Sequence, residues 1–239
     1  MLAVKGVTKR YKKTTVLNNT GFTLAPGEML GIAGHNGSGK STLLSIVAQV
    51  IPADRGEILE NDVPVLSNRA FMRQAIGYIP QRNGLLSDLT VTETLRFWQR
   101  VYGISEPIFA KGSASCLLGL EELAKKKVGA LSGGMQKRLS AALAMMHQPR
   151  YLLMDEVLPS LDRHYRLVFL DWMVDFRKQG GAVLYCSHEV EELNSLCDSI
   201  LVLRDGETVY YGDARTFPTE PAILDRMMNP VSVNKQSNK

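Results

Sequence analysis

The sequence predicts an α/β protein in which a mainly parallel sheet carries an antiparallel β layer near the N-terminus and an inserted helical subdomain. Short apolar runs of strand length recur along the chain and indicate buried strands at 29–33, 75–81, 151–156 and 182–187. Residues 2–24 and 56–65 instead alternate apolar and polar side chains, as antiparallel strands with one exposed face do. From about residue 83 to residue 148 the pattern is mostly helical, which predicts the inserted subdomain.

The N-terminal alternation predicts two strands joined by a turn at the basic stretch 9–13, whose lysines suit a solvated hairpin tip. Residues 56–65 are expected to join these strands in the antiparallel layer. Two apolar segments around the turn at 204–207 predict a final hairpin. Beyond residue 229 the chain is polar, and we expect a frayed tail there.

Three helices are predicted within the inserted subdomain. Thr90 and Glu93 are typical helix-start residues, and apolar side chains follow them up to Val101. The segment 112–127 is predicted to form a helix whose three terminal lysines face the negative end of the helix dipole. A longer helix is predicted to begin in the run 131–138 and to continue to residue 146.

The bulk composition indicates an ordinary globular chain. Its 239 residues suffice for one sizeable core, and a net charge of +4 permits anionic partners without requiring nucleic acid or membrane. The cysteines, at 116, 186 and 197, have no metal-site spacing and suit a reducing cytoplasm. No apolar run reaches the ~18–20 residues of a membrane span. We therefore expect a soluble protein, with any membrane spans carried by another chain.

A phosphate-binding loop follows the apolar run 29–33. The pattern G-x-x-x-x-G-K-[ST] is matched at every fixed position by Gly34, His35, Asn36, Gly37, Ser38, Gly39, Lys40 and Ser41, with Thr42 next. The glycines let backbone N–H groups approach phosphate oxygens, and a helix predicted over 41–50 directs its positive dipole end at the same anion. Lys40 adds charge near the outer phosphates, and the Ser41 hydroxyl is the expected magnesium ligand. The sequence thus predicts a P-loop core that binds a nucleoside triphosphate.

Two adjacent carboxylates, Asp155 and Glu156, end the strand predicted at 151–156. Because parallel strands present their carboxyl ends at the ligand edge of the sheet, both acids should lie beside the phosphate loop. They would repel a triphosphate unless a metal intervened, which is the arrangement that Mg²⁺ coordination requires.

Four further candidates are ambiguous when each is taken alone. Gln81 is either a surface residue or a ligand of the metal or of its water, and His188 is either a buried histidine or a contact of the terminal phosphate. Tyr11 could stack on an adenine ring. The Ser-Gly-Gly step at 132–134 is either a second anion cradle or a common helix-entry loop.

Taken in order, the motifs resemble those of the ATP-binding cassette (ABC) ATPase family over about residues 2–212. The resemblance implies a single ATPase domain over residues 1–212, with the helical subdomain inserted at about 83–148, followed by a C-terminal extension at 213–239 whose end is polar. The Leu-Ser-Gly-Gly signature, ahead of an Asp-Glu strand and a later Ser-His, narrows the resemblance to this family. The matching segments are Tyr11, Gly34 to Thr42, Gln81, Leu131 to Gly134, Leu152 to Glu156, Leu161-Asp162 and His188.

The resemblance implies a role for each motif, with ATP and Mg²⁺ as cofactors. Tyr11 stacks on adenine, residues 34–42 wrap the phosphates, and the metal ligands are Ser41, Gln81 and Asp155. Glu156 is the general base, while His188 and Lys40 stabilise the transition state at the terminal phosphates. In this family two cassettes pack head to tail, so that Ser132, Gly133 and Gly134 would serve the partner's ATP and Asp162 would lie at the dimer seam.

Two positions depart from the family pattern. Met135 stands where the family signature usually has Gln. A Met at this position resembles exporter-like members of the family. In the run 156–162 the proline stands at Pro159, two positions later than usual, and because proline fixes φ the path from the catalytic Glu to the dimer seam is expected to differ. All of the named catalytic groups remain.

The function implied is the ATPase subunit of a membrane transporter, placed in the cytoplasm at the inner face of the membrane by a separate permease. Met135 and the run 97–103, with its aromatic residues, favour a drug or peptide exporter, and no nucleic acid partner is expected. The alternatives are a soluble cassette of a non-transport complex, such as iron–sulfur assembly, and a weakly hydrolysing regulatory cassette.

Overall fold

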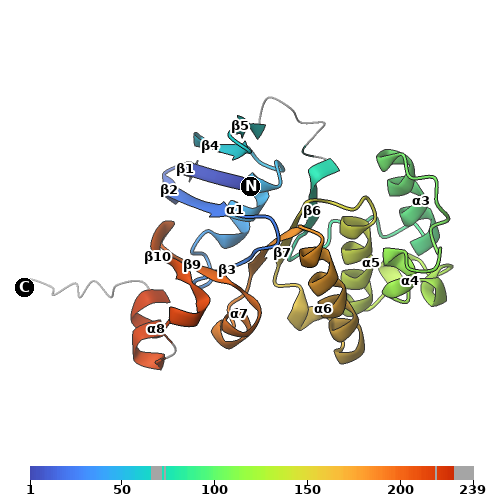
Figure 1. Ribbon diagram of the computed structural model, residues 1–239. Helices are drawn as coiled ribbons and strands as arrows, with labels where there is room; N and C mark the ends of the chain where they lie inside the picture. The colour runs from blue at the N-terminus through green and yellow to red at the C-terminus, as the bar shows by residue number, and fades with distance from the viewer. Residues whose placement is uncertain (66–71, 73, 219, 229–239) are drawn as a thin grey trace, which may run out of the picture.

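The structure, a computed structural model, describes residues 1–65, 72, 74–218 and 220–228 and contains two β-sheets with helices packed around them. Figure 1 shows the smaller sheet above α1 and the larger sheet below it, with α3, α4 and α5 grouped at one side. This arrangement confirms the predicted α/β fold with an N-terminal antiparallel layer and a mainly parallel sheet.

The smaller, four-stranded sheet is antiparallel in the order β2-β1-β4-β5. Its strands span Thr14–Leu24, Leu2–Tyr11, Arg55–Glu60 and Val63–Pro64 respectively. Ala3 pairs with Thr23 on one side and with Leu59 on the other, so the segment after the phosphate-loop helix joins the N-terminal hairpin as expected.

The larger sheet has six strands in the order β10-β9-β3-β8-β7-β6. The five strands from β9 to β6 run parallel, and β10 pairs antiparallel with β9 at the edge. In that order the strands span Glu207–Asp213, Ser199–Arg204, Met29–Ala33, Ala182–Cys186, Tyr151–Asp155 and Ile76–Ile79. The parallel register brings the carboxyl ends of β3, β8, β7 and β6 to one edge, where the candidate site residues follow.

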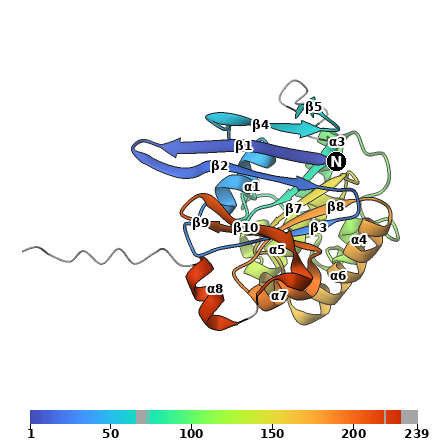
Figure 2. The same cartoon turned by 60° about the vertical axis from the view of Figure 1, so that its left-hand side comes forward.

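Each face of this sheet covers its own hydrophobic core, because successive strand residues point to opposite faces. From β3, Leu30 and Ile32 join a cluster that includes buried residues of α1 (Lys40–Val47) and of the antiparallel sheet. Met29 and Ala33 join a second cluster with residues from α5 (Gly133–Met145), α6 (Arg163–Lys178) and α7 (Val190–Leu196). Figure 2 shows α1 between the two sheets and α6 and α7 beyond the larger one.

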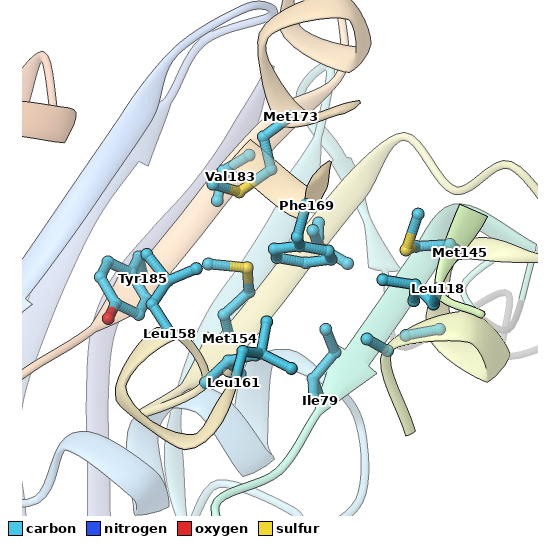
Figure 3. Close-up of a cluster of buried hydrophobic side chains, with 14 of the residues drawn as sticks. Ile79, Leu118, Met145, Met154, Leu158, Leu161, Phe169, Met173, Val183 and Tyr185 are labelled. Carbon is cyan, nitrogen blue, oxygen red and sulfur yellow. The ribbon is translucent and has the colours of Figure 1, made fainter. Parts of the chain in front are cut away.

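Phe169 anchors the second cluster. In Figure 3 its ring, from α6, lies between Met154 of β7 and the pair Leu118 and Met145 of the helical subdomain. All four side chains are buried, so the subdomain is joined to the sheet by continuous apolar packing.

Two predicted helices of the chain are shorter than expected. Helix α1 ends at Val47 instead of residue 50. The segment 112–127 contains only the four-residue α4 (Ala114–Leu117) and a 3₁₀ turn at Glu121–Leu123. Gly119 separates them at φ +62°, a left-handed conformation that interrupts the helix, and a Cβ there would meet the Tyr165 hydroxyl.

The first helix of the subdomain, α3 (Val91–Tyr102), begins with the reciprocal capping box that its sequence predicts, in which the Thr90 side chain and Glu93 each cap the other's backbone. At the other end of the chain, α8 (Pro221–Met228) is an element that the sequence pattern did not predict. The frayed tail expected beyond residue 229 lies outside the described residues. In the described part of the chain, no helix has the length and apolar character needed to span a bilayer.

Candidate active site

The phosphate loop turns through left-handed glycines. Gly34, Gly37 and Gly39 have φ values of 151°, 85° and 109°. A Cβ on Gly34 would lie 2.3 Å from the carbonyl oxygen of Leu203, and one on Gly39 would lie 2.8 Å from that of Val16. These positions accept only glycine, so the loop keeps a cradle in which its backbone N–H groups can face an anion.

Lys40 and Ser38 make the cradle fit a phosphate. The buried Lys40 ammonium donates to the carbonyl oxygens of Gly34 at 2.6 Å and His35 at 3.0 Å, which holds its positive charge inside the loop. The hydroxyl of Ser38 is buried without a hydrogen-bond partner. A buried, unpaired hydroxyl in the same loop as a fixed cation is costly without a ligand, and a phosphate oxygen would satisfy it. The loop residues Asn36 and Gly37 are exposed, and His35 contacts the Asn36 carbonyl through Nδ1 at 2.7 Å.

Asp155 ends β7 and faces the start of α1. Asp155 is 2% exposed, and the Ser41 hydroxyl lies near enough to lower the pKa of its carboxyl. Burial raises the pKa of Asp155 above its ordinary value, with the Ser41 hydrogen bond opposing the shift. A buried carboxylate next to a hydroxyl is an oxygen donor set that fits Mg²⁺, which commonly adds phosphate oxygens and water to one or two protein ligands. The described residues contain no group of three or more His, Cys, Asp and Glu side chains that could hold a metal without such additions.

Glu156 is the centre of a cluster of three candidate residues. Its backbone is left-handed at φ +49°, and its N–H donates to the Cys186 carbonyl at 3.0 Å, which turns the side chain out of the strand direction. Gln81 Nε2 donates to Oε2 at 2.6 Å, and His188 Nδ1 lies 3.3 Å from Oε1. The ends of β6, β7 and β8 therefore bring all three candidates together.

This arrangement leaves Glu156 able to act on a water molecule. A carboxylate offers about four acceptor sites, and the two neighbours occupy one on each oxygen. An amide and an imidazole on either side fix the direction of the remaining lone pairs. A carboxylate with free lone pairs held in this way has the chemistry that a general base requires.

Two predicted site segments are not part of this cluster. Tyr11, at the end of β1, is 47% exposed, and its ring lies under the Lys9 ammonium at 5.6 Å. Ser132 caps α5, accepting from the Met135 N–H at 3.3 Å. No hydrogen bond among the described residues joins 132–134 to the phosphate loop.

Lys137 is a buried residue near these candidates that the sequence pattern did not predict. Its ammonium is 2% exposed and donates to the carbonyl oxygens of Pro80 at 2.7 Å and Gln81 at 2.8 Å. Burial lowers the pKa of Lys137, while the charges of Asp155 and Glu156 oppose the shift. Lys137 therefore ties the helix that follows 132–134 to the loop that carries Gln81. Its sequence position offered no signal beyond a lysine in a largely apolar helix.

The shifted proline, Pro159, fits the backbone between Glu156 and Asp162. Pro159 lies in a 3₁₀ turn over Leu158–Ser160, where its fixed φ and missing N–H are tolerated. Val157 and Leu158 are buried in the second core cluster, and Asp162 then caps α6 by accepting from the Tyr165 N–H at 3.1 Å. Met135 packs against the same cluster.

Comparison with known proteins identifies the family. A family model described as "ABC transporter" matches residues 17–158. The linearmycin resistance ATP-binding protein LnrL of Bacillus subtilis (strain 168) is 36% identical over 214 residues, covering 89% of this chain and 69% of the relative. The Nod factor export ATP-binding protein I of Bradyrhizobium diazoefficiens is 36% identical over 203 residues, covering 84% and 66%.

Solved structures agree with the sequence relatives. An ATP-binding subunit of an ABC transporter superposes with a TM-score of 0.82 at 26% identity, covering 89% of this chain and 90% of that one. The ATP-binding cassette MJ0796, in a dimeric post-hydrolysis state bound to ADP and Pi, gives a TM-score of 0.79 at 25% identity, covering 91% of this chain and 100% of that one. This chain therefore belongs to the ABC transporter family and is an ATPase, the ATP-binding subunit of a transporter.

Proposed function

We propose that this ATPase binds Mg·ATP on residues 34–42 and hydrolyses it in a head-to-tail dimer to drive a separate membrane permease, in an exporter of drug- or peptide-like compounds. The observation that carries the catalytic part is the convergence of the phosphate loop with Glu156, Gln81 and His188 at one edge of the parallel sheet.

The roles within one chain follow from the contacts. Lys40 and the loop N–H groups neutralise the phosphates, and Tyr11 offers an exposed aromatic face to adenine. Ser41, Gln81 and Asp155 would hold Mg²⁺, which supplies charge neutralisation of the phosphates when bound. Glu156 takes the proton of the attacking water, and His188, beside it, contacts the terminal phosphate.

A second chain would complete the site. Ser132, Gly133 and Gly134 begin α5 with N–H groups free to face a phosphate, yet they are not joined to the phosphate loop of their own chain. The dimeric cassettes among the similar structures support their action on the partner's ATP.

Export is supported by the names of the relatives, one a resistance protein and another an export protein. The surface of α3 offers a docking region, because Phe97 is 52% exposed and Val101 is 53% exposed. Affinity purification of the tagged chain from detergent-solubilised membranes is expected to recover a protein with several membrane spans. Recovery of a soluble complex with unchanged ATPase activity would favour a non-transport cassette instead.

Asp155→Asn is expected to abolish the magnesium dependence of ATP binding while leaving the nucleotide-free chain as stable or slightly more stable at neutral pH. Burial raises the pKa of Asp155, so its ionised form opposes folding, and that cost is present as pH rises through the raised pKa. Urea unfolding without nucleotide, and ATP titrations with and without Mg²⁺, measure the two effects. A marked loss of stability in the variant would show that the Asp155 charge is needed by the fold.

A further inference from the structure

Glu192 is a buried carboxylate outside the ATP cluster. It lies on α7, is 7% exposed, and receives hydrogen bonds from three side chains. The Arg166 guanidinium donates to Oε1 at 2.7 Å, the Ser187 hydroxyl donates to Oε2 at 3.0 Å, and the Tyr185 hydroxyl donates to the same Oε2. Burying a charge is unfavourable unless it is paired in this way, so all four side chains are fixed relative to one another.

Two of these donors lie in or directly after the strand that leads into His188. Tyr185 lies in β8, and Ser187 immediately precedes the histidine. The Ser187 hydroxyl also accepts from the Glu189 N–H at 3.1 Å, so the residues on both sides of His188 are held through one hydroxyl. That hydroxyl is oriented by Glu192.

The His188 side chain has little support of its own. It is 55% exposed, and the contact recorded for its ring is the one to Glu156 at 3.3 Å. The direction of the imidazole therefore depends on the backbone turn beneath it. A displacement of about 1 Å in a catalytic group can cost about 10²-fold in rate.

Arg166 links this turn to α6. Its guanidinium pairs with Glu192, and its backbone N–H donates to the carbonyl of Asp162, the cap of the helix, at 2.8 Å. Glu192 thus contacts α6 and β8 from α7. Through Glu192, the turn at His188 is therefore connected to both α6 and α7.

We propose that Glu192 is a positioning residue for ATP hydrolysis, acting through Ser187 to hold His188 against Glu156 and the terminal phosphate. The inference rests on the role given to His188 in the proposed function. On this proposal, a residue of α7 affects the rate of ATP hydrolysis. The affinity for ATP is expected to stay unchanged, because none of the network residues belongs to the phosphate loop.

Glu192→Gln tests this directly. The carboxamide has one acceptor oxygen and one NH₂ group in place of two acceptor oxygens. Either its NH₂ group faces the Arg166 donor, or the Ser187 and Tyr185 hydroxyls must turn to accept from it, so the native network cannot be kept. We expect kcat for Mg·ATP hydrolysis by the full chain to fall about tenfold or more, with KM within about twofold of wild type. Glu191→Gln is the matched control: it makes the same change on the neighbouring, exposed residue and should leave both constants unchanged.

A double-mutant cycle with His188→Ala separates positioning from general support of the fold. If Glu192 acts through His188, adding Glu192→Gln to His188→Ala lowers kcat no further. An equal loss in both backgrounds, or wild-type kcat in Glu192→Gln, overturns the inference while leaving the proposed function intact. Wild-type kcat in His188→Ala overturns the role of His188 itself and the inference with it.

Ser187→Ala provides a second route if Glu192→Gln does not fold. It removes only the hydroxyl that joins Glu192 to the turn, and the same drop in kcat with unchanged KM is expected. Thermal melting and binding of a fluorescent ATP analogue establish that each variant is folded and binds nucleotide. A folded Ser187→Ala chain with wild-type kcat would contradict the proposed route.

Discussion

Glu156→Gln is expected to lower ATP turnover by at least about 10²–10⁴-fold, the range for loss of a general base, while ATP binding survives and ATP-bound dimers accumulate. The amide keeps the size and polarity of the side chain, so Gln81 and His188 retain a neighbour. It has too little basicity to take a proton from water. Phosphate release measures turnover, nucleotide titration measures binding, and size-exclusion chromatography with ATP measures the dimer.

Glu57→Gln, an exposed change on β4, serves as the control and should hydrolyse ATP at the wild-type rate. Dimer accumulation is the informative part of the result, because a cassette that closes on ATP but does not cleave it should remain closed. If Glu156→Gln hydrolysed ATP at a substantial rate similar to that of the wild type, another residue would have to be the general base. Equal and negligible turnover in both would support a regulatory cassette.

Because Asp155 and Glu156 end a strand of a parallel sheet, the sequence could place both at the ligand edge without coordinates. Strand-end position left Gln81 and His188 ambiguous, and the family resemblance assigned them to the same site as Glu156. The phosphate loop was predictable for a related reason, since its glycines have steric requirements that few other sequences meet.

Lys137 and Glu192 could not be found in this way. Both are buried charges inside helices, and their partners lie on other elements: the carbonyls after β6 for Lys137, and side chains of β8 and α6 for Glu192. Helical periodicity marks such positions as core-facing and gives no indication of which polar groups they meet. The break at Gly119 was missed because a single glycine is tolerated in many helices, and the left-handed turn depends on packing against Tyr165.

Lys40→Met is expected to raise the Kd for ATP by about tenfold to a hundredfold, since each hydrogen bond to a charged group is worth about 1.5–3 kcal/mol. The ammonium is held inside the loop by the Gly34 and His35 carbonyls, so its charge is already in place when the phosphates arrive. Turnover at saturating ATP should fall as well, because charge on the outer phosphates grows in the transition state. Isothermal titration and phosphate release measure the two losses.

The same substitution should leave the nucleotide-free fold nearly unchanged. Methionine has a similar volume and removes a buried charge, and the relief of that charge offsets the two hydrogen bonds lost to the Gly34 and His35 carbonyls. Urea unfolding without nucleotide is therefore expected to match that of Lys125→Met, an exposed control in the helical subdomain that should also keep wild-type ATP affinity. A large loss of stability in Lys40→Met would mean that the ammonium supports the loop itself. Wild-type ATP affinity in that variant would exclude Lys40 from phosphate binding, because no weaker role fits a buried cation in this cradle.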